Sequence, residues 1–218
     1  LYADHYPFRQ KATARGIRRS SLHHLLLEQG AVMGELAGWE RANWFANPGQ
    51  ERVYHYSWGR QNWFDNQAAE HKAIREGVGA YDMSSFGKIR VEGPDACAVL
   101  NRICGNDVDV EPGRLVYTQF LNYTGGIEAD VTVTRLTDTA YLVICPAATR
   151  LADQTWIERH VGDACVTVTD MTAAEATIAV MGPRARELMQ LVSPDDWSNE
   201  AHPFGHVRTI EIGMCHAR

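Results

Sequence analysis

The sequence predicts an α+β protein in which antiparallel sheets carry helices packed on one side. Two strand-like runs flank Thr124-Gly125-Gly126, and glycine tolerates the positive φ of tight hairpin turns. Residues 127–134 alternate apolar and polar side chains, as a strand with one buried face does. A strand, a Gly-Pro pair and a helix are predicted at residues 89–96 and again at 178–185. Repeated strand-turn-helix units joined by hairpins are typical of such layered folds.

The first third of the chain is the least regular. Residues 1–19 are polar, and Ser20 or Ser21 could cap a short helix that carries apolar residues and ends near Gly30. Residues 30–63 show no sustained period and hold four of the six tryptophans, so we expect a linker packed against another part of the protein. These four are Trp39, Trp44, Trp58 and Trp63.

The remaining elements follow from local signals. A helix is expected from Asp65 or Asn66 through Ile74, closed by Gly77 or Gly79. In each repeat, Pro94 or Pro183 is expected at the first helical position, where its missing N–H costs nothing. Between the repeats we expect strands at about 114–121, 127–135, 140–145 and 165–170, and a helix at about 147–160.

Composition excludes several classes of protein. With 218 residues, 45% hydrophobic and 22% charged, the chain is long enough to bury a core. A net charge of −6 leaves no basic footprint for nucleic acid, so no nucleic-acid partner is expected. No apolar run is long enough to span a membrane, so no membrane partner is expected. Arg15, Arg18 and Arg19 are expected to form a solvated surface patch.

Cysteine and histidine spacing argues against a metal site. The five cysteines are odd in number and form no CxxC pair, which favours a reducing compartment and opposes a disulfide framework. The nine histidines form no HExxH pattern. No GxGxxG or P-loop pattern occurs, so no dinucleotide site is predicted. Because the sequence starts with Leu1 and not Met, we expect it to come from a longer polypeptide.

Asp130 is the strongest candidate functional residue. Alternation places Asp130 on the same strand face as Glu128, Thr132 and Thr134. Aspartate is depleted in strands, so a carboxylate in mid-strand needs water, a partner or a ligand. An exposed polar face also explains the pattern, and periodicity alone favours that interpretation.

Several motifs resemble one family. Tyr117, Asn122, Gly125-Gly126-Ile127 and Asp130 follow in order the Y…N…GGI…D signature of the glycine-cleavage T-protein (aminomethyltransferase) superfamily. Three more segments resemble parts of that superfamily, namely residues 80–88 (AYDMSSFGK), 91–96 (VEGPDA) and 178–188 (IAVMGPRAREL). Residues 38–45 (GWERANWF) and 56–64 (YSWGRQNWF) resemble the region that joins the flavin half to the folate half in dimethylglycine and sarcosine dehydrogenases.

The resemblance implies an organisation and a function. Residues 1–50 would be the tail of the region linking the flavin half to the folate half, and residues 51–218 the first part of an aminomethyltransferase-like folate-binding domain. Tetrahydrofolate would capture the oxidised methyl carbon of a small amine or iminium substrate as 5,10-methylenetetrahydrofolate. FAD would belong to a separate flavin domain of the same or a partner polypeptide. The expected location is the cytoplasm, or the mitochondrial matrix in a eukaryote.

The resemblance also implies roles for individual residues. Asp130 would be the acid–base or electrostatic partner of the folate nitrogens. Tyr117 would flank the pterin, and Phe86, where the family usually has Met, would supply an apolar contact. A core role is equally open for these two. Met83 and Ser84 match a family loop at the same site.

Departures from the family pattern leave alternatives open. Ala129 replaces the first aspartate of the T-protein pair, as in the dehydrogenase subgroup, and Cys145-Pro146 replaces an Asn-Ala pair. The family's Tyr-x-Gly-Glu strand, whose glutamate anchors the pterin, is absent, which favours a non-catalytic folate-binding or scaffold module. Another alternative is a glycine-cleavage aminomethyltransferase with a lipoyl carrier partner, which the Trp-rich first third opposes. The last alternative is a folate-dependent demethylase that acts on a sulfonium compound.

Overall fold

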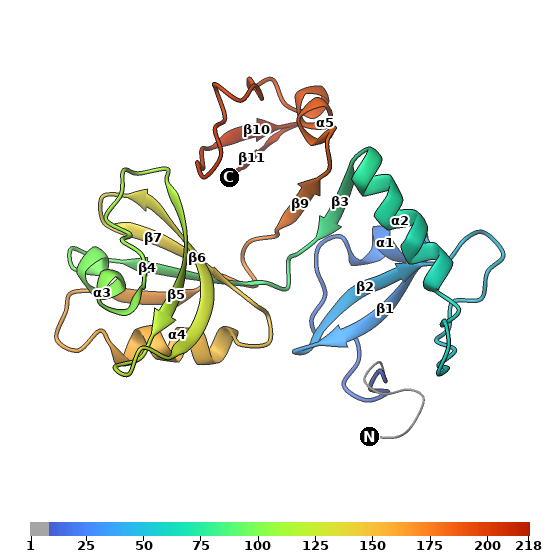
Figure 1. The fold of residues 1–218 in the computed structure, drawn as a ribbon, viewed down its shortest axis with the longest axis horizontal. Coiled ribbons are helices and arrows are strands. Elements are labelled where there is room, and N and C mark those ends of the chain that lie inside the picture. The colour runs from blue at the N-terminus through green and yellow to red at the C-terminus, as the bar shows by residue number, and fades with distance from the viewer. Residues whose placement is uncertain (1–8) are drawn as a thin grey trace. The chain divides into compact units, whose positions relative to one another are not determined.

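The computed structural model describes residues 9–218, which form two compact units (Figure 1). Unit 1 combines the described residues up to Ser85 with Ala176–Ala185. Unit 2 combines Phe86–Glu175 with Arg186–Arg218. The domain boundary proposed at residue 50 lies in a loop inside unit 1 and stays a proposal.

A β-hairpin is the centre of unit 1. Strands β1 (Ala31–Leu36) and β2 (Trp39–Phe45) pair antiparallel across a turn at Ala37 and Gly38, whose φ angles are 52° and 83°. Two positive φ angles in succession match the twist of the flanking strands. Our expectation of an irregular segment here was wrong. The pairing register shifts between Val32 and Met33, and such a bulge breaks the alternation by which strands are recognised.

Most of the tryptophans predicted in a linker stabilise unit 1 itself. Trp44 and Trp63 are buried with Val32 in a small core that Tyr54 and Tyr56 extend. The rings of Tyr54 and Trp63 meet edge-on, with centroids 5.4 Å apart, a favourable arrangement for aromatic pairs. A third tryptophan, Trp39, is also buried, whereas the side chain of Trp58 is 76% exposed.

Two helices and a second strand pair complete unit 1. Helix α1 (His23–Glu28) occupies the expected position, but no side chain caps it, so the predicted serine cap is wrong. Instead, the carbonyl of Ser20 accepts the His23 N–H at 3.2 Å. Helix α2 (Phe64–Glu76) ends at Gly77, as predicted. The antiparallel pair consists of β3 (Gly79–Asp82) and β9 (Ile178–Met181).

A salt bridge fastens the segment before α1 to the hairpin. The Arg15 guanidinium donates from Nε and Nη2 to the two Glu40 carboxylate oxygens, at 2.7 and 2.6 Å. The Gly16 N–H donates to the same carboxylate at 2.7 Å. Glu40 is buried, and the hydrogen bond from Arg15 lowers its pKa. Arg15 is therefore a structural residue, which corrects our expectation of a solvated patch.

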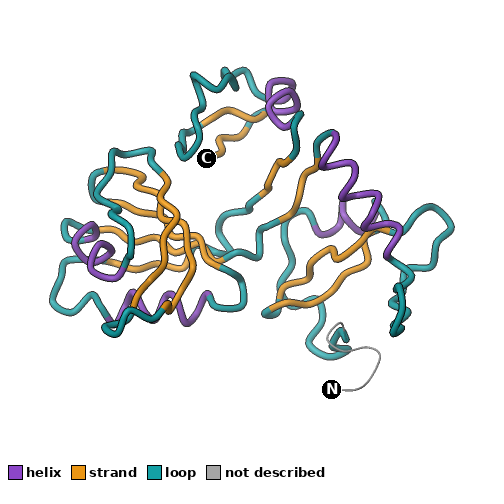
Figure 2. The backbone as a smooth tube through the Cα atoms, viewed as in Figure 1, coloured by secondary structure: helices purple, strands orange, loops and turns teal. Residues whose placement is uncertain are grey.

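Unit 2 is built on a five-stranded antiparallel sheet with the strand order β5-β6-β7-β4-β8, drawn as strands in Figure 2. Helices α3 and α4 supply core residues to one face of it, so the prediction of antiparallel strands with helices on one side is confirmed. The elements are β4 (Gly87–Glu92), α3 (Ala96–Ile103), β5 (Leu115–Leu121), β6 (Ile127–Thr137), β7 (Ala140–Cys145), α4 (Arg150–Arg159) and β8 (Thr167–Asp170).

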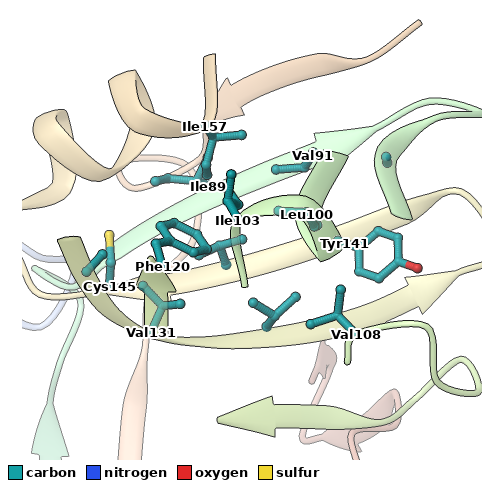
Figure 3. Packing of buried hydrophobic residues seen from close by; sticks show 14 residues of the cluster. Ile89, Val91, Leu100, Ile103, Val108, Phe120, Val131, Tyr141, Cys145 and Ile157 are labelled. Atoms are coloured by element: carbon teal, nitrogen blue, oxygen red, sulfur yellow. The ribbon is translucent and has the colours of Figure 1, made fainter. Parts of the chain in front are cut away.

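The core of unit 2 lies between this face of the sheet and the two helices (Figure 3). Alternate residues of each central strand point into it, because side chains of a strand alternate between the two faces. The cluster contains Ile89, Val91, Ala96, Leu100, Ile103, Val108, Phe120, Ala129, Val131, Val133, Tyr141, Val143, Cys145 and Ile157. The opposite face of β5 and β6 carries the candidate functional residues.

Both copies of the predicted repeat fold as strand, glycine turn and helix. β4 leads through Gly93 to α3, and β9 leads through Gly182 to α5 (Ala185–Val192). The φ angles of the two glycines are 144° and 121°. Their prolines precede the helices by two residues and do not occupy the first helical position, which corrects that detail. The chain ends in a hairpin of β10 (Ile210–Ile212) and β11 (Cys215–Ala217).

Candidate functional site

The hairpin β5–β6 carries the site, and Asn122 shapes its turn. The side-chain oxygen of Asn122 accepts the N–H groups of Thr124, at 3.1 Å, and Gly126, at 2.8 Å. The side-chain nitrogen donates to Glu128 at 2.7 Å. Gly125 has a φ of 81°, as the turn requires, but Gly126 does not lie in the positive-φ region. Gly126 is restricted instead by space, because a Cβ there would lie 2.8 Å from the Asn122 side chain.

The predicted alternation along β6 is confirmed around Asp130. Ala129, Val131 and Val133 are buried against the helices, whereas Asp130 is exposed on the other face. Two residues differ from the pattern. Ile127 is 70% exposed, because the register of the strand pair shifts between Phe120 and Leu121. Thr134 is buried, since it lies in mid-sheet between partners on β5 and β7.

Two side chains of β5 stand beside Asp130. Gln119 is its directly opposed partner across the strands, and Gln119 Nε2 donates to Asp130 Oδ1 at 3.2 Å. Tyr117 lies two residues along the same face, and a hydrogen bond to the Asp130 carboxylate raises the pKa of Tyr117. Over residues 9–218, Asp130 forms no ion pair. Its carboxylate is therefore held by neutral donors.

Phe86 lies at the same end of the sheet, at the start of β4. One row of paired residues crosses four strands: Tyr117 on β5, Thr132 on β6, Ile144 on β7 and Lys88 on β4. Strands β6 and β4 run in the same direction, because each pairs antiparallel with β7. Phe86 lies two residues before Lys88, just as Asp130 lies two residues before Thr132. One strand, β7, separates their positions, so the two backbones are about 10 Å apart at a strand spacing of about 4.8 Å. Phe86 itself is half-buried.

Met83 and Ser84 belong to unit 1, where they follow β3 directly. The Met83 N–H donates to the Thr177 carbonyl at 2.8 Å. Ser84 is buried, and its hydroxyl accepts the Thr177 N–H at 3.1 Å. Met83 also lines a cavity of about 270 Å³ within unit 1, together with Leu26, Arg41, Ala42, Phe45, Ala80, Tyr81, Asp82 and Met181.

Cys145 points away from the face that carries Asp130. It is buried in the core of unit 2, and burial strongly raises the pKa of its thiol. A thiol held protonated in a core is a poor nucleophile. Cys145-Pro146 stands where the family has an Asn-Ala pair. The side chain of residue 145 therefore adds no polar group to the open face.

Gln119 is the residue of this site that the sequence analysis missed. Strand periodicity describes each strand separately and does not say which residues of two strands oppose each other. A hairpin turn sets the register of the strands that it joins, but a bulge changes that register. Pairing the strands outward from residues 122–126 brings Gln119 opposite Ala129, and only the register shift between Phe120 and Leu121 moves its partner to Asp130.

A metal site and a membrane-spanning helix are both absent from the described part of the chain. Among residues 9–218, no three His, Cys, Asp or Glu side chains gather in a metal-binding arrangement. Within the same range, no helix combines the length and apolar character needed to cross a lipid bilayer.

Fold and site together define an α+β domain that carries the Asp130 carboxylate on an open sheet face, beside the exposed phenol ring of Tyr117. Comparison with known proteins specifies the family. Residues 22–218 match the profile of the GCVT N-terminal domain. The chain belongs to this family, so the resemblance seen in the sequence is confirmed.

The relatives include enzymes of two kinds. The chain is 49% identical over 217 residues to 4-methylaminobutanoate oxidase (formaldehyde-forming) of Paenarthrobacter nicotinovorans, covering 100% of this chain and 26% of that protein. It is 31% identical to mitochondrial dimethylglycine dehydrogenase of Rattus norvegicus, covering 95% of this chain and 24% of that protein. It is 35% identical to aminomethyltransferase of Methylococcus capsulatus, covering 80% of this chain and 44% of that protein.

A solved structure agrees with the fold. The glycine cleavage system aminomethyltransferase T of Bartonella henselae superposes with a TM-score of 0.66 at 23% identity, covering 80% of this chain and 43% of that one. The chain is thus an aminomethyltransferase-type domain related to those of demethylating enzymes. It spans about a quarter of the length of its oxidase and dehydrogenase relatives.

Proposed function

We propose that this chain is the tetrahydrofolate-binding, one-carbon-transfer module of a demethylating enzyme of the dimethylglycine and sarcosine dehydrogenase type. The observation that supports this most is Asp130, an exposed carboxylate without an ion pair, flanked by Gln119 and Tyr117. A carboxylate on an open face attracts a cationic amine or iminium species.

The residues present fit tetrahydrofolate. When bound, tetrahydrofolate would supply the amine nitrogens that take up the one-carbon unit. The Tyr117 side chain is 57% exposed, so its ring is free to stack on a flat heterocycle. Phe86 would supply an apolar contact at the same end of the sheet. Met83 and Ser84 stay proposals for the same cofactor, based on their match to the family loop.

Asp130 would hold and move a proton at one oxygen. Gln119 donates to Oδ1, and the carboxylate lone pairs that its protein donors leave free would accept a proton from a ligand N–H. The Tyr117 hydroxyl, whose pKa is raised, stays a donor at neutral pH and keeps the carboxylate in place. The negative charge would also stabilise the cationic carbon as it passes between amines.

The names of the relatives support a substrate class. Dimethylglycine, sarcosine and 4-methylaminobutanoate are all N-methylated amino acids, so we propose an N-methylated amino acid as the substrate. Oxidation of such a methyl group would use FAD in a flavin domain of the same or a partner polypeptide. The proposed location is the cytoplasm, or the mitochondrial matrix in a eukaryote.

A glycine-cleavage aminomethyltransferase is the second candidate, favoured by the relative from Methylococcus capsulatus. The oxidase from Paenarthrobacter nicotinovorans is more similar and covers the whole chain, including the Trp-rich first third. This similarity favours the demethylating enzymes in our proposal.

The substitution Asp130→Asn tests the proposed function in the enzyme that combines this chain with its flavin-dependent part. Asparagine keeps the shape but removes the charge and the proton acceptor. Amine oxidation should continue, while the yield of methylenetetrahydrofolate falls by about 10²- to 10⁴-fold and formaldehyde rises to match. Amine consumption, methylenetetrahydrofolate and formaldehyde are measured in one reaction.

A matched control is Asp138→Asn, which makes the same change in the β6–β7 turn. It should leave all three quantities at parental values. An unchanged folate product in Asp130→Asn would show that this carboxylate is only a solvated strand residue, and the proposal would be lost.

A further inference from the structure

We infer that Gln119 is a positioning residue for Asp130, an assignment that rests on the proposed function. The two residues are direct partners in the β5–β6 register, and their side chains share a 3.2 Å hydrogen bond. A carboxylate accepts only, so the Gln119 amide must turn its NH₂ toward Asp130. The amide therefore holds the carboxylate at Oδ1 and restricts its orientation.

The local chemistry explains why such a residue is needed. Asp130 is exposed, and in the described part of the chain no cation orients it. A lone carboxylate on a strand rotates about its side-chain bonds, and reactions lose rate when a proton acceptor is misplaced. Gln119 restricts this rotation without neutralising the charge, which a lysine or arginine would do. A neutral donor thus serves both requirements.

Gln119 also links Asp130 to Tyr117. The amide forms a hydrogen bond that lowers the pKa of Tyr117, opposing the larger effect of the carboxylate. The three side chains therefore form one connected group on the open face of the hairpin.

The test is Gln119→Met, which keeps the length of the side chain and removes its hydrogen bonds. In the flavin-containing enzyme, kcat for methylenetetrahydrofolate formation should fall about 10-fold, with formaldehyde increased. The KM for tetrahydrofolate should change much less, and amine oxidation and the melting temperature should stay parental. The matched control is Gln154→Met, since Gln154 donates to Glu158 at 2.8 Å on the exposed side of α4. It should change none of these quantities.

A double variant distinguishes positioning from an independent role. If Gln119 acts through Asp130, then Gln119→Met combined with Asp130→Asn should transfer no more slowly than Asp130→Asn alone. Additive losses would overturn the inference, as would a parental product ratio in Gln119→Met. If Asp130→Asn itself leaves the folate product unchanged, the proposed function fails. If only Gln119→Met has no effect, this inference fails and the proposed function stands.

Discussion

Glu40 and Asp130 are both acidic residues on strands, and their surroundings differ in burial and in the charge of the hydrogen-bond partners. Glu40 is buried and neutralised by the Arg15 guanidinium, so it stabilises unit 1. Asp130 is exposed and contacts neutral groups only, so its charge is available to a ligand. At the scale of the residue, the partner and the degree of burial separate a structural carboxylate from one that is available to a ligand.

The stability of unit 1 should therefore depend on pH through Glu40. Its pKa is lowered in the folded protein, so the stabilisation is complete above the ordinary glutamate pKa of about 4.3 and is lost as pH falls through the folded value. Glu40→Gln should cost about 1–3 kcal/mol at pH 7, because it leaves the Arg15 guanidinium without its carboxylate. Below a pH of about 4, the difference in unfolding free energy between the variant and the parent should shrink. Chemical unfolding of both proteins at several pH values measures this difference.

The control for this experiment is Glu92→Gln. Glu92 pairs with Arg90 at 2.9 Å, but both side chains are more than a third exposed, so the loss should stay below about 1 kcal/mol. A gap for Glu40→Gln that is equally small, or that is independent of pH, would contradict the structural role of the Arg15–Glu40 pair.

At the scale of the element, glycines show how turns depend on different kinds of constraint. Gly125 needs its positive φ, but a side chain there would enter open space. Gly93 also has a positive φ, and a Cβ there would overlap the carbonyl oxygen of Cys165. Gly125 thus requires backbone freedom alone, whereas Gly93 requires close approach of two backbones as well.

Alanine substitutions should reveal this difference. Gly125→Ala should destabilise unit 2 by about 1 kcal/mol, the cost of a left-handed conformation. Gly93→Ala should cost about 3 kcal/mol or more, because backbone strain and overlap act together. Urea unfolding curves of the two variants and the parent measure both values. Equal losses would show that the contact between Gly93 and Cys165 carries no energetic weight.

At the scale of the whole molecule, we propose that oxidation and carbon capture are divided between this chain and a flavin domain. No glycine-rich dinucleotide loop occurs in this sequence, and the chain spans about a quarter of its oxidase and dehydrogenase relatives. The hydride chemistry of demethylation belongs to a flavin, so the chain would contribute the capture of the product carbon.

The purified 218-residue polypeptide should therefore be colourless. Its visible spectrum after desalting should show no flavin band, and the supernatant after heat denaturation should contain no released flavin. Addition of free FAD followed by gel filtration provides the control for weak binding. A flavin band that persists at one equivalent per chain would contradict the division of labour proposed here.

Local patterns were enough to predict much of this protein. Alternation and glycine turns predicted β5, β6 and β7, the two strand-glycine-helix repeats, and Asp130 on an open face, because these features depend on neighbours in the chain. The bulged β1–β2 hairpin was missed, since its register shift breaks the alternation. The pairing of Arg15 with Glu40 and of Gln119 with Asp130 was decided only by the tertiary structure. Both pairs join residues that are separated in sequence, and only folding determines which distant side chains come within hydrogen-bonding distance.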